Sequence, residues 1–140
     1  TSQPLFSPSA GGVFKNPPLP IIEDHTIRFP PWPQTKLLLK AVEKEPERVM
    51  KIIESCKLPQ DKKDWNIYVF IDFVEIALKM PSKIGKRIVN LVEKQKWLMC
   101  PYAFNSLLAD KLSDLMIKLA NTIKIGPRLI AFSRNFLIPS

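Results

Sequence analysis

Glycine, cysteine and histidine are scarce in this 140-residue sequence. Phosphate-binding loops and nucleophile elbows need glycines at fixed spacings, because the backbone there turns sharply or approaches the substrate closely. The four glycines of this chain form none of these patterns. Their scarcity therefore excludes most nucleotide-handling functions.

The two cysteines and the single histidine do not form a recognisable site. Cys56 and Cys100 lie 44 positions apart, no C-x-x-C spacing occurs, and His25 is the only histidine. This arrangement argues against a disulfide framework and against a Cys/His zinc site. We therefore expect a protein of a reducing compartment, the cytoplasm, with no cofactor.

Long hydrophobic runs are absent as well. The longest candidate, residues 64–80, is interrupted by Asn66, Asp72, Glu75 and Lys79, whereas a membrane span needs about 18 or more apolar residues. The sequence starts at Thr1 without an initiator methionine or a signal peptide. We expect a piece of a longer polypeptide that does not enter a membrane.

Proline, in contrast, is abundant, and eight of the 14 prolines fall within residues 1–33. Each proline fixes its own backbone angle and disfavours a helical conformation of the preceding residue, so this segment is not helical. It also carries apolar residues that a disordered linker would mostly lack. We predict an extended arm, residues 1–33, pinned to the rest of the chain by these side chains: Leu5, Phe6, Val13, Phe14, Ile21, Ile22, Ile27, Phe29 and Trp32. The alternative is a proline-rich ligand around Pro17-Pro18-Leu19-Pro20.

Helical periodicity begins at residue 34, so residues 34–140 are predicted to form an α-helical domain. Thr35 is expected to cap a first helix with Leu38, Ala41 and Val42 inward. Pro46 is expected to start a second helix, and the apolar face of that helix predicts that Cys56 is buried and inert. A proline in the first turn of a helix costs no hydrogen bond, so Pro81 is likewise expected to start the helix that follows residues 65–80.

Residues 65–80 are harder to assign, because Ile67 to Ile71 favour a strand. The polar positions 64, 68, 72, 75 and 79 nevertheless recur at steps of three and four, which lines one side of a helix. We predict a long, mostly buried helix here. A loop at 97–101, a fifth helix at about 102–124 and an apolar last helix from 128 complete the prediction.

Three helix-to-helix breaks resemble one another, at Pro46, Pro81 and Pro127, with an aliphatic residue three positions after each proline. Their spacings of 35 and 46 residues bracket the repeat lengths of helical-hairpin solenoids. The predicted fold is therefore all-α, with the arm followed by about three stacked antiparallel helix pairs of the TPR or HEAT kind. An ordinary six-helix bundle would produce the same breaks. The apolar last helix predicts either a continuing chain or a homodimer interface.

Short motifs in this order resemble a recurring region of large, uncharacterised bacterial proteins, in which a Gly-Phe-x-x-Pro-Pro element and a Trp-Pro element precede paired helices. The matching residues span most of the chain and are Ala10 to Phe14, Asn16 to Pro18, Phe29 to Pro33, Glu45-Pro46 and Ala77 to Pro81. This resemblance implies a helical-repeat segment of a multidomain protein, with no assigned activity and no catalytic residue.

Isolated residues that could do chemistry all have a simpler interpretation. His25 follows two acidic residues but lies in the arm, where a solvated turn is expected. Cys100 precedes a proline after an apolar run and lacks a histidine partner, so a packed thiol is expected. The carboxylate pairs Asp72/Glu75 and Asp110/Asp114 have the spacing of any amphipathic helix. We expect no enzyme and no small-molecule substrate.

Charge provides the remaining functional signal. The chain carries a net +8, with ten basic and eight acidic residues before position 71 but eleven and five after it. The excess gathers between positions 79 and 96, opposed only by Glu93, and predicts a contiguous basic helix face: Lys79, Lys83, Lys86, Arg87 and Lys94.

This basic face is commonly no more than a solvated surface, but it could also bind an acidic protein surface, either another domain of the same polypeptide or a separate partner. A phosphate backbone is the second possible partner. No aromatic residues are interleaved with the lysines, so base stacking is unsupported. We therefore expect a non-enzymatic scaffold or protein-interaction segment, with nucleic-acid binding as the alternative.

Overall fold

The computed structural model describes residues 16–102 and 107–122. Its described part is mostly helical, with a short two-stranded sheet. The predicted last helix, the break at Pro127 and the apolar residues of the arm before position 16 lie outside the described residues. The sheet means that the all-α prediction is wrong in this detail.

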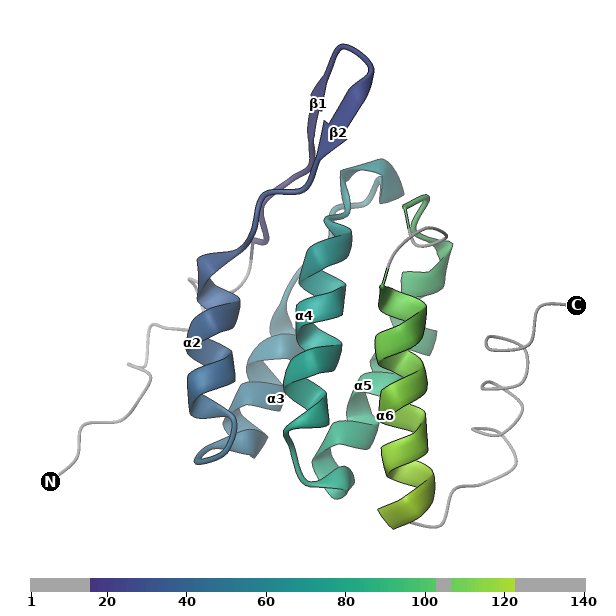
Figure 1. The fold of residues 1–140 in the computed structure, drawn as a ribbon. Helices are drawn as coiled ribbons and strands as arrows, with labels where there is room; N and C mark the ends of the chain where they lie inside the picture. The colour runs from purple at the N-terminus through teal and green to yellow at the C-terminus, as the bar shows by residue number, and fades with distance from the viewer. Residues whose placement is uncertain (1–15, 103–106, 123–140) are drawn as a thin grey trace, which may run out of the picture.

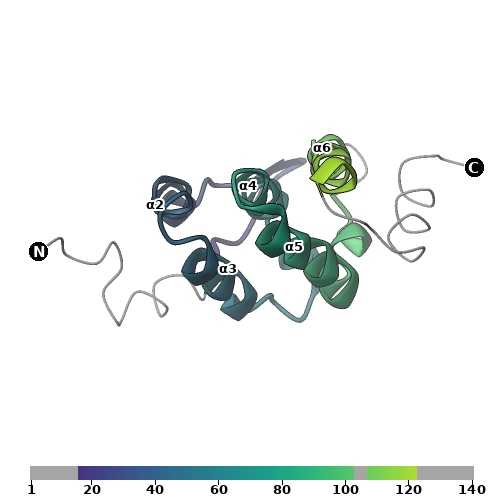
Figure 2. The ribbon, with the colours of Figure 1, turned by 90° about the horizontal axis from the view of Figure 1, so that it is seen from below.

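The helices form two layers (Figures 1 and 2). Helices α2 (Pro33–Ala41), α4 (Ile67–Leu78) and α6 (Leu108–Thr122) lie side by side in one layer. Helices α3 (Pro46–Ser55) and α5 (Ser82–Gln95) form the second layer and run in the opposite direction. Each α-helix of the first layer contacts its neighbour, α2 to α4 and α4 to α6, and α3 contacts α5.

Proline lies at the start of three helices: Pro46 and Pro81 were predicted there, whereas Pro33 was predicted to belong to the arm. Pro33 and Pro46 occupy the first turns of α2 and α3, where a missing backbone N–H costs nothing, and Pro81 precedes α5 as its N-cap. Thr35, predicted to be the cap of the first helix, lies instead inside the first turn of α2. The N-cap there is Trp32, whose side chain makes no capping hydrogen bond.

Helix α4 forms the centre of the molecule, and eight of its 12 residues are buried. It begins two residues later than predicted because the side chain of Asn66 accepts a hydrogen bond from the backbone N–H of Tyr68 at 3.1 Å, which caps the helix. The residues left at least partly exposed include Tyr68, Asp72 and Glu75. The polar stripe that decided between helix and strand is therefore confirmed.

The predicted loop at 97–101 contains a short 3-10 helix, η2 (Trp97–Met99). Lys96 adopts a left-handed conformation, with φ of 58°, and ends α5. The chain then turns back, and the fully buried ring of Trp97 stacks on Phe70 with ring centroids 4.5 Å apart. Stacking of this kind adds to the area that the two rings bury.

Helix α6 begins at Leu108 rather than near Tyr102, and residues 103–106 and 123–124 of the predicted helix lie outside the described residues. Its buried side includes Leu108, Leu112, Leu115 and Leu119. Lys118 reaches across to α4 and donates to the backbone carbonyls of Leu78 and Met80, both at 2.6 Å. A cation at this position also complements the negative end of the α4 dipole.

The arm contains a β-hairpin, whereas the sequence predicted an extended segment without strands. Strands β1 (Ile21–Glu23) and β2 (Thr26–Arg28) pair antiparallel, with Ile22 opposite Ile27. The turn places Asp24 in a left-handed conformation that aspartate tolerates better than most residues. Both strands are exposed along their whole length and project from the helical body (Figure 1).

The hairpin overturns part of the prediction for the arm. Trp32 is buried and meets the ring of Phe73 edge-on, so the arm is pinned at this end. Ile21, Ile22 and Ile27, however, are exposed. Two kinds of contact hold the base of the hairpin. Phe29 packs against the core as predicted, and the side chain of Asn66 donates to the carbonyls of Pro18 and Pro30, at 3.2 and 2.7 Å.

Candidate binding surfaces

The basic face predicted from the sequence lies mainly on the outer side of α5. Lys83, Lys86 and Lys94 are exposed, and the apolar residues of the same helix point to the core. None of the three forms an ion pair with another described residue. We call these three side chains the lysine row.

Arg87, unlike the lysine row, forms ion pairs. Its guanidinium donates to Glu47 at 2.6 Å and to Glu54, both on α3, so it joins the two helices of the second layer. These hydrogen bonds raise the pKa of Arg87 and lower that of Glu47. Glu93 is the only acidic residue within positions 79–96, but the two carboxylates that pair with Arg87 come from a helix more than 30 positions earlier.

Lys79 also stands apart from the row. It is the C-cap of α4, and Pro81 separates it from α5, so the predicted face does not continue along a single helix to position 79. The side chain is exposed and lies in the turn between the two helices. Of the five predicted residues, three thus share the surface of α5 as free cations.

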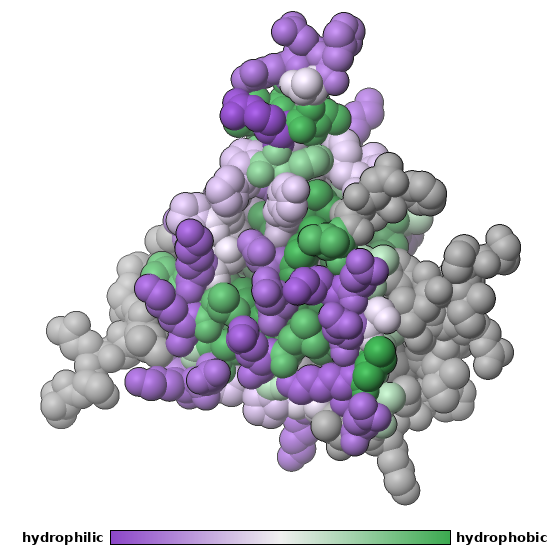
Figure 3. All heavy atoms as spheres, viewed as in Figure 1, coloured by the Kyte–Doolittle hydropathy of each residue, from purple (hydrophilic) through white to green (hydrophobic). Residues whose placement is uncertain are grey.

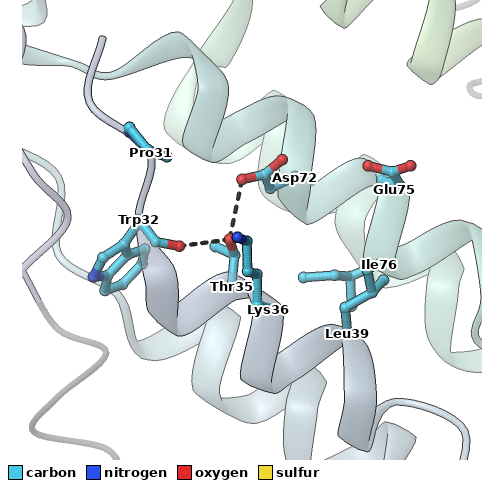
Figure 4. A pocket seen from close by; sticks show the side chains of 8 residues that line it. All are labelled: Pro31, Trp32, Thr35, Lys36, Leu39, Asp72, Glu75 and Ile76. Carbon is cyan, nitrogen blue, oxygen red and sulfur yellow. Dashed lines mark hydrogen bonds between the residues drawn. The ribbon is translucent and has the colours of Figure 1, made fainter.

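A second surface feature lies in the other layer, between α2 and α4. A groove of about 290 Å³ opens there. Its wall is largely apolar, and it contains two carboxylates, one lysine and one hydroxyl (Figure 4). The lining residues are Pro31, Trp32, Thr35, Lys36, Leu39, Asp72, Glu75 and Ile76. We call it the α2–α4 groove.

The carboxylate of Asp72 is partly buried in this groove. Burial raises its pKa, and a hydrogen bond from the hydroxyl of Thr35, at 3.0 Å, offsets part of that effect. The same hydroxyl lies 2.8 Å from the carbonyl of Trp32 (Figure 4). A threonine hydroxyl has one hydrogen, so it can donate to only one of these two acceptors at a time.

The groove is not predictable from the sequence. Helical spacing places Asp72 and Glu75 on one side of a helix, but Thr35 and Lys36 are more than 35 positions away. The available signal was the polar pair on an otherwise buried helix. Such a pair marks where the helix reaches the surface without showing which helix lies beside it.

The other candidates agree with their simpler interpretations. His25 is exposed in the hairpin turn. Both cysteines are buried and neither forms a disulfide, and burial raises the pKa of Cys56 to about 12 and also raises that of Cys100. A thiol of raised pKa is a poor nucleophile at neutral pH.

Asp110 and Asp114 are exposed on α6, away from the groove. Within residues 16–102 and 107–122, no group of three or more histidine, cysteine, aspartate or glutamate side chains could hold a metal ion. Over the same ranges, no helix combines the length and the apolar character needed to cross a bilayer.

Comparison of the chain with protein-family models, with curated proteins and with solved structures gives no match.

Proposed function

We propose that this chain is a non-enzymatic, cytoplasmic protein-interaction segment of a larger bacterial protein, built as a short helical repeat. The two layers support the repeat, because α2, α4 and α6 run in the same direction and each following helix packs beneath them (Figures 1 and 2). The two buried thiols, which form no disulfide, support a reducing compartment.

The observation that carries the proposed function is the lysine row. Lys83, Lys86 and Lys94 are free cations beside an arginine that is fully engaged with α3. A surface of unpaired lysines attracts a surface of opposite charge, and this attraction is largest when the partner excludes water from part of the contact. The proposed partner is therefore an acidic protein surface.

The test is a titration of the chain with polyglutamate and, separately, with a DNA duplex, at about 0.05 and 0.3 M salt. Replacing Lys83, Lys86 and Lys94 by glutamate is expected to lower the affinity for polyglutamate by about tenfold or more at low salt, and by less at high salt. Arg87 is left in place, because its loss would leave the α3 carboxylates unpaired. The matched control changes Lys40, Lys44 and Lys57, which are also exposed, to glutamate.

Equal weakening in the control variant would show that net charge, and not the row, binds the acid. A row variant that binds polyglutamate like the parent would contradict the proposal. Binding to duplex DNA that is tighter than binding to polyglutamate at 0.3 M salt, and that is lost in the row variant, would replace it with the nucleic-acid function.

A further inference from the structure

The α2–α4 groove is a fixed part of the fold, because contacts at one end hold its two helices together. The ring of Trp32 packs edge-on against Phe73 of α4, with centroids 6.3 Å apart, and Thr35 of α2 donates to Asp72 of α4. Trp32 is only 5% exposed. The groove is therefore present before any partner arrives, so little ordering is needed on binding.

The groove contains a carboxylate that has too few hydrogen-bond donors. Asp72 is half-buried, and the hydroxyl of Thr35 is its one hydrogen-bond donor within the described residues. That hydroxyl is shared with the carbonyl of Trp32. An ionised carboxylate can accept several hydrogen bonds, so Asp72 keeps unused acceptor positions next to the groove.

The groove is also a local acidic exception on a basic chain. Glu75 lies one turn further along α4, and its contact with Lys111 of α6, at 3.7 Å, is between side chains that are both about one-third exposed or more. Such surface pairs are weak and readily exchanged. Lys36 lines the groove but forms no ion pair with either carboxylate. A second cation therefore finds two carboxylates with little competition.

Apolar side chains lie next to these carboxylates. Leu39 from α2 and Ile76 from α4 line the part of the groove beyond Thr35 (Figure 4). The exposed face of this layer shows hydrophobic patches between hydrophilic residues (Figure 3). A ligand that fits the groove must therefore present a cation and aliphatic groups at the same time, as a segment of polypeptide does.

We propose that the α2–α4 groove binds a segment of a partner polypeptide in which one lysine or arginine is flanked by aliphatic residues. The cationic side chain hydrogen-bonds to Asp72 and Glu75, and the aliphatic side chains cover the partly exposed Leu39 beside the buried Ile76. This site is independent of the lysine row, because it lies in the other helical layer and selects the opposite charge. The chain thus has two docking surfaces of different chemistry.

The test uses an array of acetylated, amidated nine-residue peptides with lysine, arginine, norleucine or glutamate at the centre and leucine, valine or alanine around it. Binding is followed by amide chemical shifts of the ¹⁵N-labelled chain. Lysine or arginine peptides are expected to shift the amides of Thr35, Lys36, Asp72 and Glu75. The variants Asp72→Asn and Glu75→Gln are expected to weaken binding by about tenfold and by a smaller factor, respectively.

Asp114→Asn is the matched control, since it removes the same charge from an exposed position outside the groove. Glu75→Gln, at a half-exposed position, guards against a folding defect in the other variant. The proposal would be overturned if norleucine peptides bound as tightly as lysine peptides, or if both groove variants bound the lysine peptides as tightly as the parent chain. It would also be overturned if only free lysine amide, and none of the peptides, shifted the groove amides. Replacement of the lysine row should leave peptide binding intact, which separates this proposal from the proposed function.

Discussion

The carboxylate of Asp72 lines the α2–α4 groove, but its ionisation lowers the stability of the folded chain. Burial raises the pKa of its carboxyl above the ordinary value of 3.8 despite the hydrogen bond from Thr35. Ionisation therefore costs more free energy in the folded chain than in the unfolded chain. The contribution of this group to the free energy of unfolding falls as pH rises from below the unfolded pKa through the raised, folded pKa.

The substitution Asp72→Asn tests this sign. Asparagine has the shape of the protonated acid and can still accept the hydrogen bond from Thr35. The variant is therefore expected to be more stable than the parent at pH 7 and equally stable near pH 3, about one unit below the ordinary aspartate pKa, where the parent side chain is also neutral. Urea unfolding of both proteins at the two pH values measures the difference, and a less stable variant at pH 7 would contradict the expected sign.

At the scale of residues, the sequence predicts which side chains are buried but not which residues of other helices they contact. The burial of Cys56, Leu38 and Val42 follows from helical spacing alone and is confirmed. The partners of Asp72 and Arg87 come from other helices, 37 and at least 33 positions away. Spacing within one helix contains no information on such contacts, so neither was predictable.

The contact between α4 and α5 depends on Gly85, which is buried on the inner side of α5. A Cβ atom at this position would lie 2.9 Å from the backbone carbonyl oxygen of Ala77 on α4. Backbone atoms of a packed helix do not move aside as the tip of a side chain does. The glycine therefore sets how closely these two helices can approach.

Gly85→Ala is expected to lower the free energy of unfolding by about 1–2 kcal/mol, because overpacking typically costs 1–3 kcal/mol and the gain in helix propensity returns at most about 1 kcal/mol. Thermal or urea unfolding measures the change. Asn90→Ala on the exposed side of the same helix is the control, and it is expected to stabilise by a few tenths of a kcal/mol. A stabilised Gly85→Ala protein would show that the two helices separate easily.

Asn66 connects two elements, since it caps α4 and holds the base of the hairpin. Asn66→Ser keeps a good cap acceptor but removes the amide that donates to the two proline carbonyls. Hydrogen exchange of the hairpin amides at 21–28 is expected to accelerate, by an amount corresponding to about 1 kcal/mol for each part-buried carbonyl that loses its hydrogen bond. The amides of α4 should keep their protection.

Asn90→Ser on α5 is the matched substitution at an exposed position, and it should leave hairpin exchange unchanged. Unchanged exchange in Asn66→Ser itself would mean that aromatic contacts alone hold the base. Those contacts are present, because the ring of Phe29 meets Tyr68 and Tyr102 edge-on at 5.8 and 4.9 Å.

At the scale of elements, proline and helical periodicity predicted most of the described architecture. Pro46 begins a helix and Pro81 caps one, and the ambiguous segment before Met80 is helical because its polar positions recur at three and four. The hairpin was missed because strands of three residues are too short to show alternation. Proline content correctly excluded a helix there but does not distinguish an open arm from a paired one.

At the scale of the whole molecule, the two faces of the layered fold differ in charge. The outer side of α5 exposes the lysine row, whereas the other layer contains the α2–α4 groove with its two carboxylates. Composition showed the net excess of base but could not show that an arginine in its centre is neutralised by α3. The distribution of charge over the surface depends on how the layers stack, which sequence spacing indicates only in outline.

The hydrogen bonds at the base of the hairpin determine where residues can be inserted into the chain. Pro18 and Pro30 are held by the same amide, so the residues between them form a loop whose ends are already closed by the body of the protein. Adding residues at the turn near Asp24 would lengthen that loop at a small entropic cost and would leave the closure untouched. The hairpin tip is thus the place where an inserted tag or an added recognition sequence should be accepted without disturbing the helices.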